Sequence, residues 1–355
     1  MQKRVLITGH NGYIGSVMAP AFMRAGYEVV GMDYGYFGEC TLVPDIIDVP
    51  SVHKDIRDLG VSDLSGFNAV IHLAALSNDP IGNLNEKWTE EINFRATVRL
   101  AELAKAAGVE RFLFSSSCIM YGLSEAALVN EESSLDPQTE YARSKVKSER
   151  AIAALADENF SPTFMRNGTV YGVSPRMRFD TVFNDLMGAA VTTGKVTLYS
   201  DGQPWRPVVH VEDVASAFLA ALGAPTAAVW NQAFNTGANH LNHQIVDLAE
   251  IVCDTVPGCK LEILATPGAD QRTYKADFAK FARVFPDFTF KWNAKEGARQ
   301  LYQTFNQIGL NQDRFTDKRF TRLKWLRYLL DTGQVDSGLR WNGVGAPAHA
   351  TASFF

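Results

Sequence analysis

The sequence predicts an α/β fold in which a doubly wound parallel sheet is joined by a smaller, interleaved C-terminal substrate lobe. Short apolar runs alternate with helical patterns as far as Asn167, and this order typically builds a parallel sheet covered by helices. The first apolar run ends in a glycine-rich turn that opens a helix. A chain of 355 residues is also long enough for a large domain and a second lobe.

The elements follow from local patterns. The apolar runs Val5–Ile7 and Glu28–Met32 predict buried strands. Between them, helical periodicity from Gly12 to Ala25 ends at Gly26, a residue type that commonly caps helices. A third strand is expected before Asp55. Further strands are predicted at 69–73, 111–114 and 163–165, and long helices at Leu84–Ala107 and Thr139–Ala156.

After Asn167 the pattern becomes less regular, with segments rich in glycine, proline and asparagine. We expect this part to form the lobe that covers the substrate, except that Val208–Leu222 returns to the main domain. The predicted division is therefore 1–170 with about 208–235 for the cofactor-binding domain, and 171–207 with 236–355 for the lobe and tail. The tail predicts short helices at Thr321–Asp331 and Asp336–Arg340.

Composition excludes several classes of function. A net charge of −5 gives no basic surface for nucleic acid. No apolar run reaches the roughly 18 residues of a membrane span, and the N-terminus has no signal-peptide pattern. The four cysteines, at positions 40, 118, 253 and 259, form no C-x-x-C pair, which argues against zinc or a disulfide framework. We expect a metal-free cytoplasmic protein with no nucleic-acid or membrane partner.

The segment Thr8–Gly15 follows a strand and opens a helix, so its glycines are placed to let a pyrophosphate approach the helix N-terminus. Asp33 ends the second strand about 20 residues beyond this loop, where a carboxylate accepts hydrogen bonds from ribose hydroxyls and repels a 2′-phosphate. No lysine or arginine lies between Asp33 and Glu39. The pattern therefore favours NAD over NADP.

Tyr141 and Lys145 are one helical turn apart, so their side chains share a face of the predicted helix. A buried ammonium beside a phenol favours the phenolate, which makes tyrosine useful as a base near neutral pH. Serine hydroxyls precede the pair at Ser115–Ser117. A serine there can hold the reacting oxygen while the phenol exchanges its proton.

In this order, the motifs resemble the extended short-chain dehydrogenase/reductase family, and within it the NAD-dependent nucleotide-sugar epimerase/dehydratase group that includes UDP-galactose 4-epimerase-like enzymes. The resemblance covers residues 1 to about 305 and implies a Rossmann-type sheet. It rests on T-G-x-x-G-x-x-G, the tyrosine–lysine pair and a set of further matches: Asp33, Asp55–Asp58, His72–Ala75, Asn93, Ser115–Ser117, Tyr121-Gly122, Arg166, Tyr171-Gly172, Arg206 and His210–Ala215.

The resemblance also implies roles. Tyr141 would be the acid/base, Ser117 would orient the substrate oxygen, and Lys145 would lower the tyrosine pKa and bind the nicotinamide ribose. Thr169, Arg206 and Arg272 would join Ser117 in binding the sugar nucleotide. Residues from the glycine loop, the strand ends and two helices would line NAD: Gly9, Asn11, Gly12, Tyr13, Ile14, Gly15, Asp33, Asp55, Ile56, Leu73, Ala74, Ala75, Asn93, Ser115, Tyr141 and Lys145.

The choice of reaction depends on two positions after Ser117. Related dehydratases and decarboxylases carry an acidic residue there, whereas this chain has Cys118 and Ile119. We therefore expect an epimerase, acting at C4 of a nucleotide sugar through a transient keto-sugar. A catalytic thiol at Cys118 is a side hypothesis beside that of a small buried cysteine.

Three alternatives stay open: a nucleotide-sugar 4-ketoreductase or dehydrogenase, a ketoreductase of a non-sugar substrate, and a dinucleotide-binding protein without catalysis. The helices Leu84–Ala107 and Thr139–Ala156 match those through which relatives pair, so a homodimer with a four-helix bundle is also expected.

Overall fold

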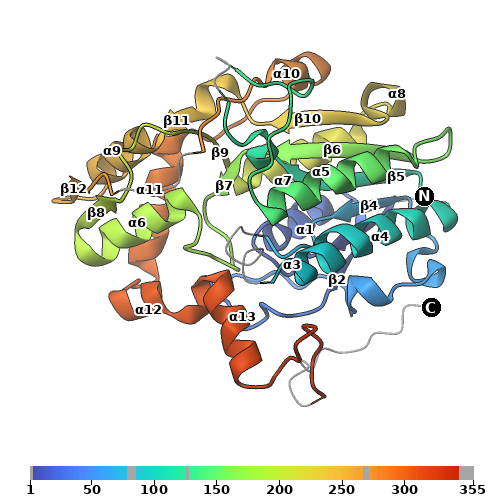
Figure 1. Ribbon diagram of the computed structural model, residues 1–355, viewed down its shortest axis with the longest axis horizontal. Helices are drawn as coiled ribbons and strands as arrows, with labels where there is room; N and C mark the ends of the chain where they lie inside the picture. Colours follow the sequence, from blue (N-terminus) through green and yellow to red (C-terminus); the bar gives the residue numbers. More distant parts are fainter. Residues whose placement is uncertain (1–2, 78–84, 125–127, 267–271, 344–355) are drawn as a thin grey trace.

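The computed structural model describes residues 3–77, 85–124, 128–266 and 272–343 (Figure 1). Within these ranges, seven parallel strands form one sheet in the order β10-β6-β5-β4-β1-β2-β3. Their bounds are Arg4–Thr8 (β1), Glu28–Asp33 (β2), Ser51–His53 (β3), Ala69–His72 (β4), Arg111–Ser117 (β5), Ser161–Asn167 (β6) and Gln232–Thr236 (β10). The predicted doubly wound parallel sheet is confirmed.

The order of the strands reverses between β1 and β4, because the chain adds β2 and β3 on one side and the later strands on the other. Ligands of open α/β sheets bind outside the carboxyl ends of the strands at such a switch point. The glycine loop follows β1, and Leu73 follows β4. The topology therefore brings both predicted cofactor segments to one crevice.

Helices cover both faces of the sheet (Figure 1). On one face, α1 (Gly15–Arg24) and α7 (Val211–Gly223) pack together over a core that contains Phe22 and Phe218. The other face is covered by α3 (Glu86–Trp88), η3 (Thr89–Arg95), α4 (Ala96–Ala106) and α5 (Glu140–Ala153). Leu100, Phe112 and Ile152 lie in the core beneath them.

The helix predicted over Leu84–Ala107 is interrupted, and Leu84 itself lies outside the described residues. Its middle part, η3, is a wide π-helical segment. The wide turn buries Asn93, whose side chain accepts from the backbone nitrogen of Leu76 at 2.8 Å and donates to its carbonyl at 3.0 Å. Nothing in the periodicity of the sequence indicated this turn.

A second layer follows β6. In the described chain, β9 (Trp205–His210) lies between β7 (Thr169–Tyr171) and β11 (Asn242–Gln244), and β8 (Lys195–Leu198) pairs with β12 (Lys260–Ile263). The accompanying helices are α6 (Val182–Thr193), α9 (Ile245–Thr255) and α11 (Ala294–Gln307), whereas α8 (Thr226–Val229) and α10 (Ala279–Val284) contact the β6 and β10 end of the large sheet. Short 3₁₀ turns span 56–58, 61–64, 118–121 and 239–241.

The segment Val208–Leu222, expected to return to the main domain, does so only in part. Its helix α7 packs on the large sheet, but its strand β9 pairs with β7 and β11. The strand that enters the large sheet is β10, beside β6. The division of the chain into two domains stays a prediction.

The tail continues as α12 (Gln312–Thr316), η6 (Lys318–Phe320) and α13 (Arg322–Asp331). The helix predicted over Thr321–Asp331 is confirmed, whereas the one over Asp336–Arg340 is wrong. Those five residues form a tight turn between paired Val335 and Trp341. The Asp336 carboxylate accepts from the backbone of Arg340 at 2.8 Å, and Leu339 has a φ of 57°, so local side-chain bonding replaces the helix.

Candidate active site

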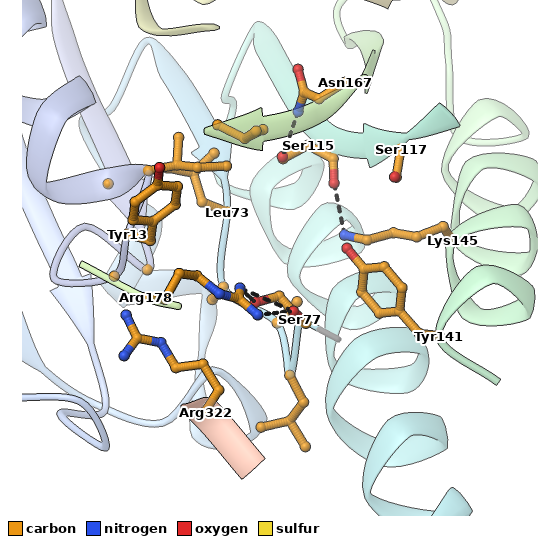
Figure 2. A pocket seen from close by; sticks show the side chains of 18 of the residues that line it. Tyr13, Leu73, Ser77, Ser115, Ser117, Tyr141, Lys145, Asn167, Arg178 and Arg322 are labelled. Atoms are coloured by element: carbon orange, nitrogen blue, oxygen red, sulfur yellow. Dashed lines mark hydrogen bonds between the residues drawn. The ribbon is translucent and has the colours of Figure 1, made fainter. Parts of the chain in front are cut away.

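A cavity of about 530 Å³ lies at the carboxyl ends of β1, β4 and β5. Its wall comes from the glycine loop, the strand ends, helix α5, the loop after β6 and the start of α13. Figure 2 shows that Tyr13 and Tyr141 stand on opposite sides of it. Its lining runs from the glycine loop to Tyr141, Arg206 and Arg272.

The glycine loop is closely fitted to the sheet. Gly9 has a φ of +73°, and a Cβ on it would lie 2.7 Å from the backbone nitrogen of Ala74. A Cβ on Gly15 would collide with the carbonyl oxygen of Gly9. The loop and the first residue of α1 line the cavity. The free N–H groups at the helix N-terminus and the helix dipole favour an anion there. The loop therefore fits the pyrophosphate of a dinucleotide.

Of the predicted loop residues, Gly9, Gly12, Tyr13, Ile14 and Gly15 line the cavity, and Asn11 does not. The Asn11 side chain instead accepts from Arg176 Nε at 2.9 Å and Nη2 at 2.7 Å.

The Asp33 carboxylate lines the cavity at the end of β2. It accepts from the backbone nitrogens of Gly35 at 2.8 Å and Asn11 at 3.1 Å. Each carboxylate oxygen has a further lone pair, so the group can also accept from two ribose hydroxyls. The position fits the predicted role.

Asp55 and Ile56 line the same end of the cavity. The Asp55 carboxylate, 5% exposed, is already bound by Arg57 Nη2 at 2.6 Å and Arg340 Nη1 at 2.9 Å. No sequence motif indicated Arg340, which is 285 positions away along the chain. A contact between Asp55 and adenine stays a prediction.

Leu73, Ala74 and Ala75 line the cavity after β4, but Asn93 does not. Asn93 is buried, and it holds the backbone of Leu76 through the two hydrogen bonds described above. Asn93 therefore stabilises the loop after β4 and does not line the cavity.

The predicted catalytic residues come together at the other end. Ser117 ends β5, and Tyr141 and Lys145 lie on α5; all three line the cavity (Figure 2). Lys145 Nζ lies 5.6 Å from the centre of the Tyr141 ring and donates to the Ser115 carbonyl at 2.7 Å. Asn167, which sequence reasoning missed, donates to Ser115 Oγ at 3.1 Å.

Burial sets the electrostatics of Lys145. The side chain is 4% exposed, and desolvation lowers its pKa to about 7, although the Glu149 carboxylate acts in the opposite direction. The charge on Lys145 at neutral pH is therefore sensitive to the groups around it. Hydroxyl oxygens or a phenolate beside it would favour the ammonium form.

The side chains of Cys118 and Ile119, the two residues after Ser117, point in different directions. Ile119 lines the cavity, whereas Cys118 is fully buried and its thiol donates to the Arg166 carbonyl at 3.1 Å. Burial raises the pKa of the Cys118 thiol above its usual value. The cavity wall next to Ser117 thus presents an alkyl group, and the thiol points into protein.

At the predicted substrate end, Thr169, Arg206 and Arg272 line the cavity. Arg206 Nη1 donates to the carbonyl oxygens of Trp205, at 2.9 Å, and Arg272. The Arg206 guanidinium is therefore held against the backbone of Arg272. Guanidinium groups suit phosphate oxygens, which they bind with charge-assisted hydrogen bonds.

Sequence reasoning missed other residues of the wall, which carry no motif of their own: Tyr36, Phe37, Ser77, Arg178, Asp180, Tyr274 and Arg322. Among the described residues, no group of three or more His, Cys, Asp or Glu side chains is arranged to hold a metal ion. None of the helices described is both long and apolar enough to cross a bilayer.

Comparisons with known proteins agree with this geometry. A model of the NAD dependent epimerase/dehydratase family matches residues 5–237. UDP-glucose 4-epimerase 4 of Oryza sativa subsp. japonica is 28% identical over 333 residues, which are 84% of this chain and 88% of that protein.

Solved structures extend the likeness. MoeE5 in complex with UDP-glucuronic acid and NAD is 26% identical, with a TM-score of 0.74 over 86% of this chain and 99% of that one. DesIV, a dTDP-glucose 4,6-dehydratase from Streptomyces venezuelae, is 23% identical, with a TM-score of 0.75 over 88% and 99% of the two chains. At that identity the likeness concerns the fold.

Proposed function

Because the chain belongs to the NAD-dependent epimerase/dehydratase family, we propose that it is a nucleotide-sugar epimerase that inverts the configuration at C4. One observation carries this choice within the family: among the described residues of the cavity wall, the side chain that follows Ser117 is the alkyl group of Ile119 and not a carboxylate. Removal of water or carbon dioxide needs a further acid or base at carbon. Inversion at C4 needs proton exchange at one oxygen.

Tyr141 is the proposed acid/base. Its phenolate takes the proton from the sugar O4, while the hydroxyl of Ser117 holds that oxygen. The chemistry that bound NAD would supply is reversible hydride transfer with the sugar carbon. Tyr141 gives the proton back once the keto-sugar has turned its other face toward the cofactor.

In this proposal, Lys145 favours the phenolate through its charge and binds the nicotinamide ribose. The residues that would hold NAD lie at the other end of the cavity, where the glycine loop and Asp33 fit a pyrophosphate and a ribose. Carboxylate recognition of ribose hydroxyls supports NAD over NADP.

Arg206 and Arg272 support a substrate with a diphosphate. Both residues line the cavity, and guanidinium groups suit phosphate oxygens, which they bind with charge-assisted hydrogen bonds. A ketoreductase of a non-sugar substrate would have no use for them. Similar proteins are named as UDP-glucose 4-epimerases, so UDP-glucose and UDP-galactose are the first substrates to try.

The test is conversion without added cofactor. Protein purified with its own NAD should interconvert UDP-glucose and UDP-galactose, or another C4 pair from a panel of UDP-, GDP-, CDP- and dTDP-sugars, followed by NMR. Turnover only with added NADH or NADPH and a keto-sugar would instead identify a reductase. Dinucleotide binding without any turnover would identify a non-catalytic protein.

A homodimer stays a proposal. It would pair η3, α4 and α5 with the same helices of a second copy, as a four-helix bundle. These helices lie side by side on one face of the molecule (Figure 1). Light scattering at micromolar concentration should give twice the monomer mass of 39.1 kDa; the monomer mass itself would exclude the dimer.

A further inference from the structure

The segment Arg322–Trp341, here named the C-terminal clamp, lies against the nucleotide end of the cavity. Trp325 Nε1 donates to the Tyr36 carbonyl at 2.6 Å, and the Tyr36 hydroxyl donates to the Leu339 carbonyl. Tyr36 itself lines the cavity. Helix α13 and the turn after it are thus hydrogen-bonded to Tyr36, in the segment that follows β2.

The turn at Asp336–Arg340, within the C-terminal clamp, also bonds to the segment Asp55–Asp58. Arg57 Nη1 donates to the Gly338 carbonyl at 2.6 Å, and Arg340 pairs with both Asp55 and Asp58. On the β2 side, Trp341 Nε1 donates to the Tyr34 carbonyl at 2.8 Å. The clamp therefore ties together the two segments expected to hold the adenosine.

Arg322 brings a charge from the clamp into the cavity. Arg322 and Arg178 both line it, and they are 3% and 6% exposed. Arg322 Nη2 donates to the Arg176 carbonyl at 2.7 Å, and its guanidinium lies 4.5 Å from the centre of the Phe37 ring. Arg178 Nη1 donates to the Ser77 carbonyl at 3.1 Å.

The two guanidinium groups share one nearby carboxylate. Asp180 pairs with Arg178 Nε at 2.5 Å, and it meets Arg322 only through the backbone nitrogen, at 3.0 Å. Across the described chain, no carboxylate oxygen lies within 4.0 Å of the Arg322 guanidinium. Burial and the charge of Arg178 lower the pKa of Arg322 to about 10, so the group stays charged at neutral pH.

A buried cation without a full counter-charge is costly, and an anion in the cavity would remove that cost. In Figure 2, Arg322 lies on the Tyr13 side of the cavity, and Arg178 lies between it and Ser77. Tyr13 and the N-terminus of α1 belong to the glycine loop, which itself favours an anion. The substrate diphosphate is expected elsewhere, at Arg206 and Arg272.

The geometry points to the pyrophosphate of the dinucleotide as this anion: Arg178 and Arg322 bind it, and the C-terminal clamp thereby retains the cofactor. This inference rests on the proposed NAD-dependent function. The resemblance in sequence ends near residue 305, before the clamp begins. Release of the cofactor requires the clamp to loosen, which suits an enzyme that regenerates its NAD in every turnover.

The test compares nucleotide binding by Arg322→Gln with that by the wild type, after bound nucleotide has been stripped. Titration calorimetry should show NAD and ADP-ribose bound about tenfold to a hundredfold more weakly, because a charged hydrogen bond is lost. Adenosine, which has no phosphate, and UDP should bind as before. Arg327→Gln, at an exposed arginine on the same helix, is the matched control and should behave as the wild type.

A second variant keeps the test decisive if Arg322→Gln does not fold. Arg340→Gln, at a side chain 34% exposed, frees the turn from Asp55 and should speed NAD dissociation in stopped flow. If NAD affinity and release are unchanged in these variants, the inference that the C-terminal clamp retains NAD is wrong, whereas the proposed function is unaffected. Weaker binding of UDP in place of NAD would also overturn it. Failure of the wild type to bind NAD would overturn the proposed function as well.

Discussion

Lys145 Nζ donates a 2.7 Å hydrogen bond to the carbonyl oxygen of Ser115, and this contact ties the middle of α5 to β5. It brings the face of α5 that carries Tyr141 to the end of the strand, where Ser117 lies. The bond also uses one of the three donors of the ammonium group. The other two N–H donors remain available for the nicotinamide ribose that Lys145 is proposed to bind.

Replacing Tyr141 with phenylalanine should lower kcat by about 10²–10⁴, the usual contribution of a positioned acid/base. The ring and its packing are retained, so NAD affinity should change less than about threefold, well under the 1.4 kcal/mol of a tenfold change. Steady-state kinetics and calorimetry on the same preparation give both values. Retention of normal turnover would remove Tyr141 from the chemistry.

The lowered pKa of Lys145 predicts a pH dependence of stability in the nucleotide-free protein. Its folded-state pKa of about 7 lies below the roughly 10.4 of an unfolded lysine. Between these values the unfolded chain binds more protons, so the free energy of unfolding rises with pH.

Lys145→Met lacks this titration. Relative to the wild type it should be most stable at or below pH 7, and the difference should shrink toward pH 10. Denaturant unfolding at pH 6.5, 8 and 9.5 measures the trend. If the difference in the free energy of unfolding between the two proteins is constant across this pH range, burial does not lower the pKa of Lys145 as described.

Cys118→Ala separates a packing role from a chemical one. The thiol is fully buried and bonded to a backbone carbonyl, so its loss should cost about 1–2 kcal/mol of stability, as is usual for a buried truncation. Turnover at a temperature well below the melting point should stay near normal. A loss of kcat above about a hundredfold, or 2.7 kcal/mol, would restore the hypothesis of a catalytic thiol.

Arg206→Ala should raise KM for the nucleotide sugar by about tenfold to a hundredfold, because a charge-assisted contact to phosphate is removed. NAD affinity should not change. Arg95→Ala, at a side chain 72% exposed, is a control that should leave both constants alone. An equal loss of affinity for NAD would place Arg206 at the cofactor instead.

Asp33→Asn should reduce the preference for NAD over NADP. The amide keeps one acceptor oxygen for the backbone of the glycine loop, but it no longer repels a 2′-phosphate. The ratio of the two dissociation constants should fall by about tenfold, the scale of one charge interaction. An unchanged ratio would mean that another residue sets the choice of dinucleotide.

The parts of the site that could be predicted from the sequence are those that a short motif encodes. The glycine loop, Asp33 and the tyrosine–lysine spacing are each contained in a short segment, and all line one cavity. Arg178, Arg322 and Arg340 carry no such pattern. Arg322 and Arg340 lie beside the segment after β2 because the tail packs back on it, and that contact spans 303 positions of the chain. Arg178 reaches the cavity from the irregular loop between β7 and α6.

Local competition explains the remaining differences. Asp336 can bond its own neighbours, and a turn formed where a helix over Asp336–Arg340 was predicted. The π-helical turn at Asn93 depends on the partner it finds at Leu76, which lies outside the helix. Sequence periodicity contains no information on either partner.

The central claim is that the hydride removed from C4 returns to the same carbon while Tyr141 moves only the oxygen-bound proton. The most direct test is to incubate the enzyme in ordinary water with a nucleotide sugar that carries deuterium at C4. The account predicts a C4 epimer that retains its deuterium, as seen by NMR and mass spectrometry. Exchange of that deuterium with solvent, or loss of water from the sugar, would contradict it.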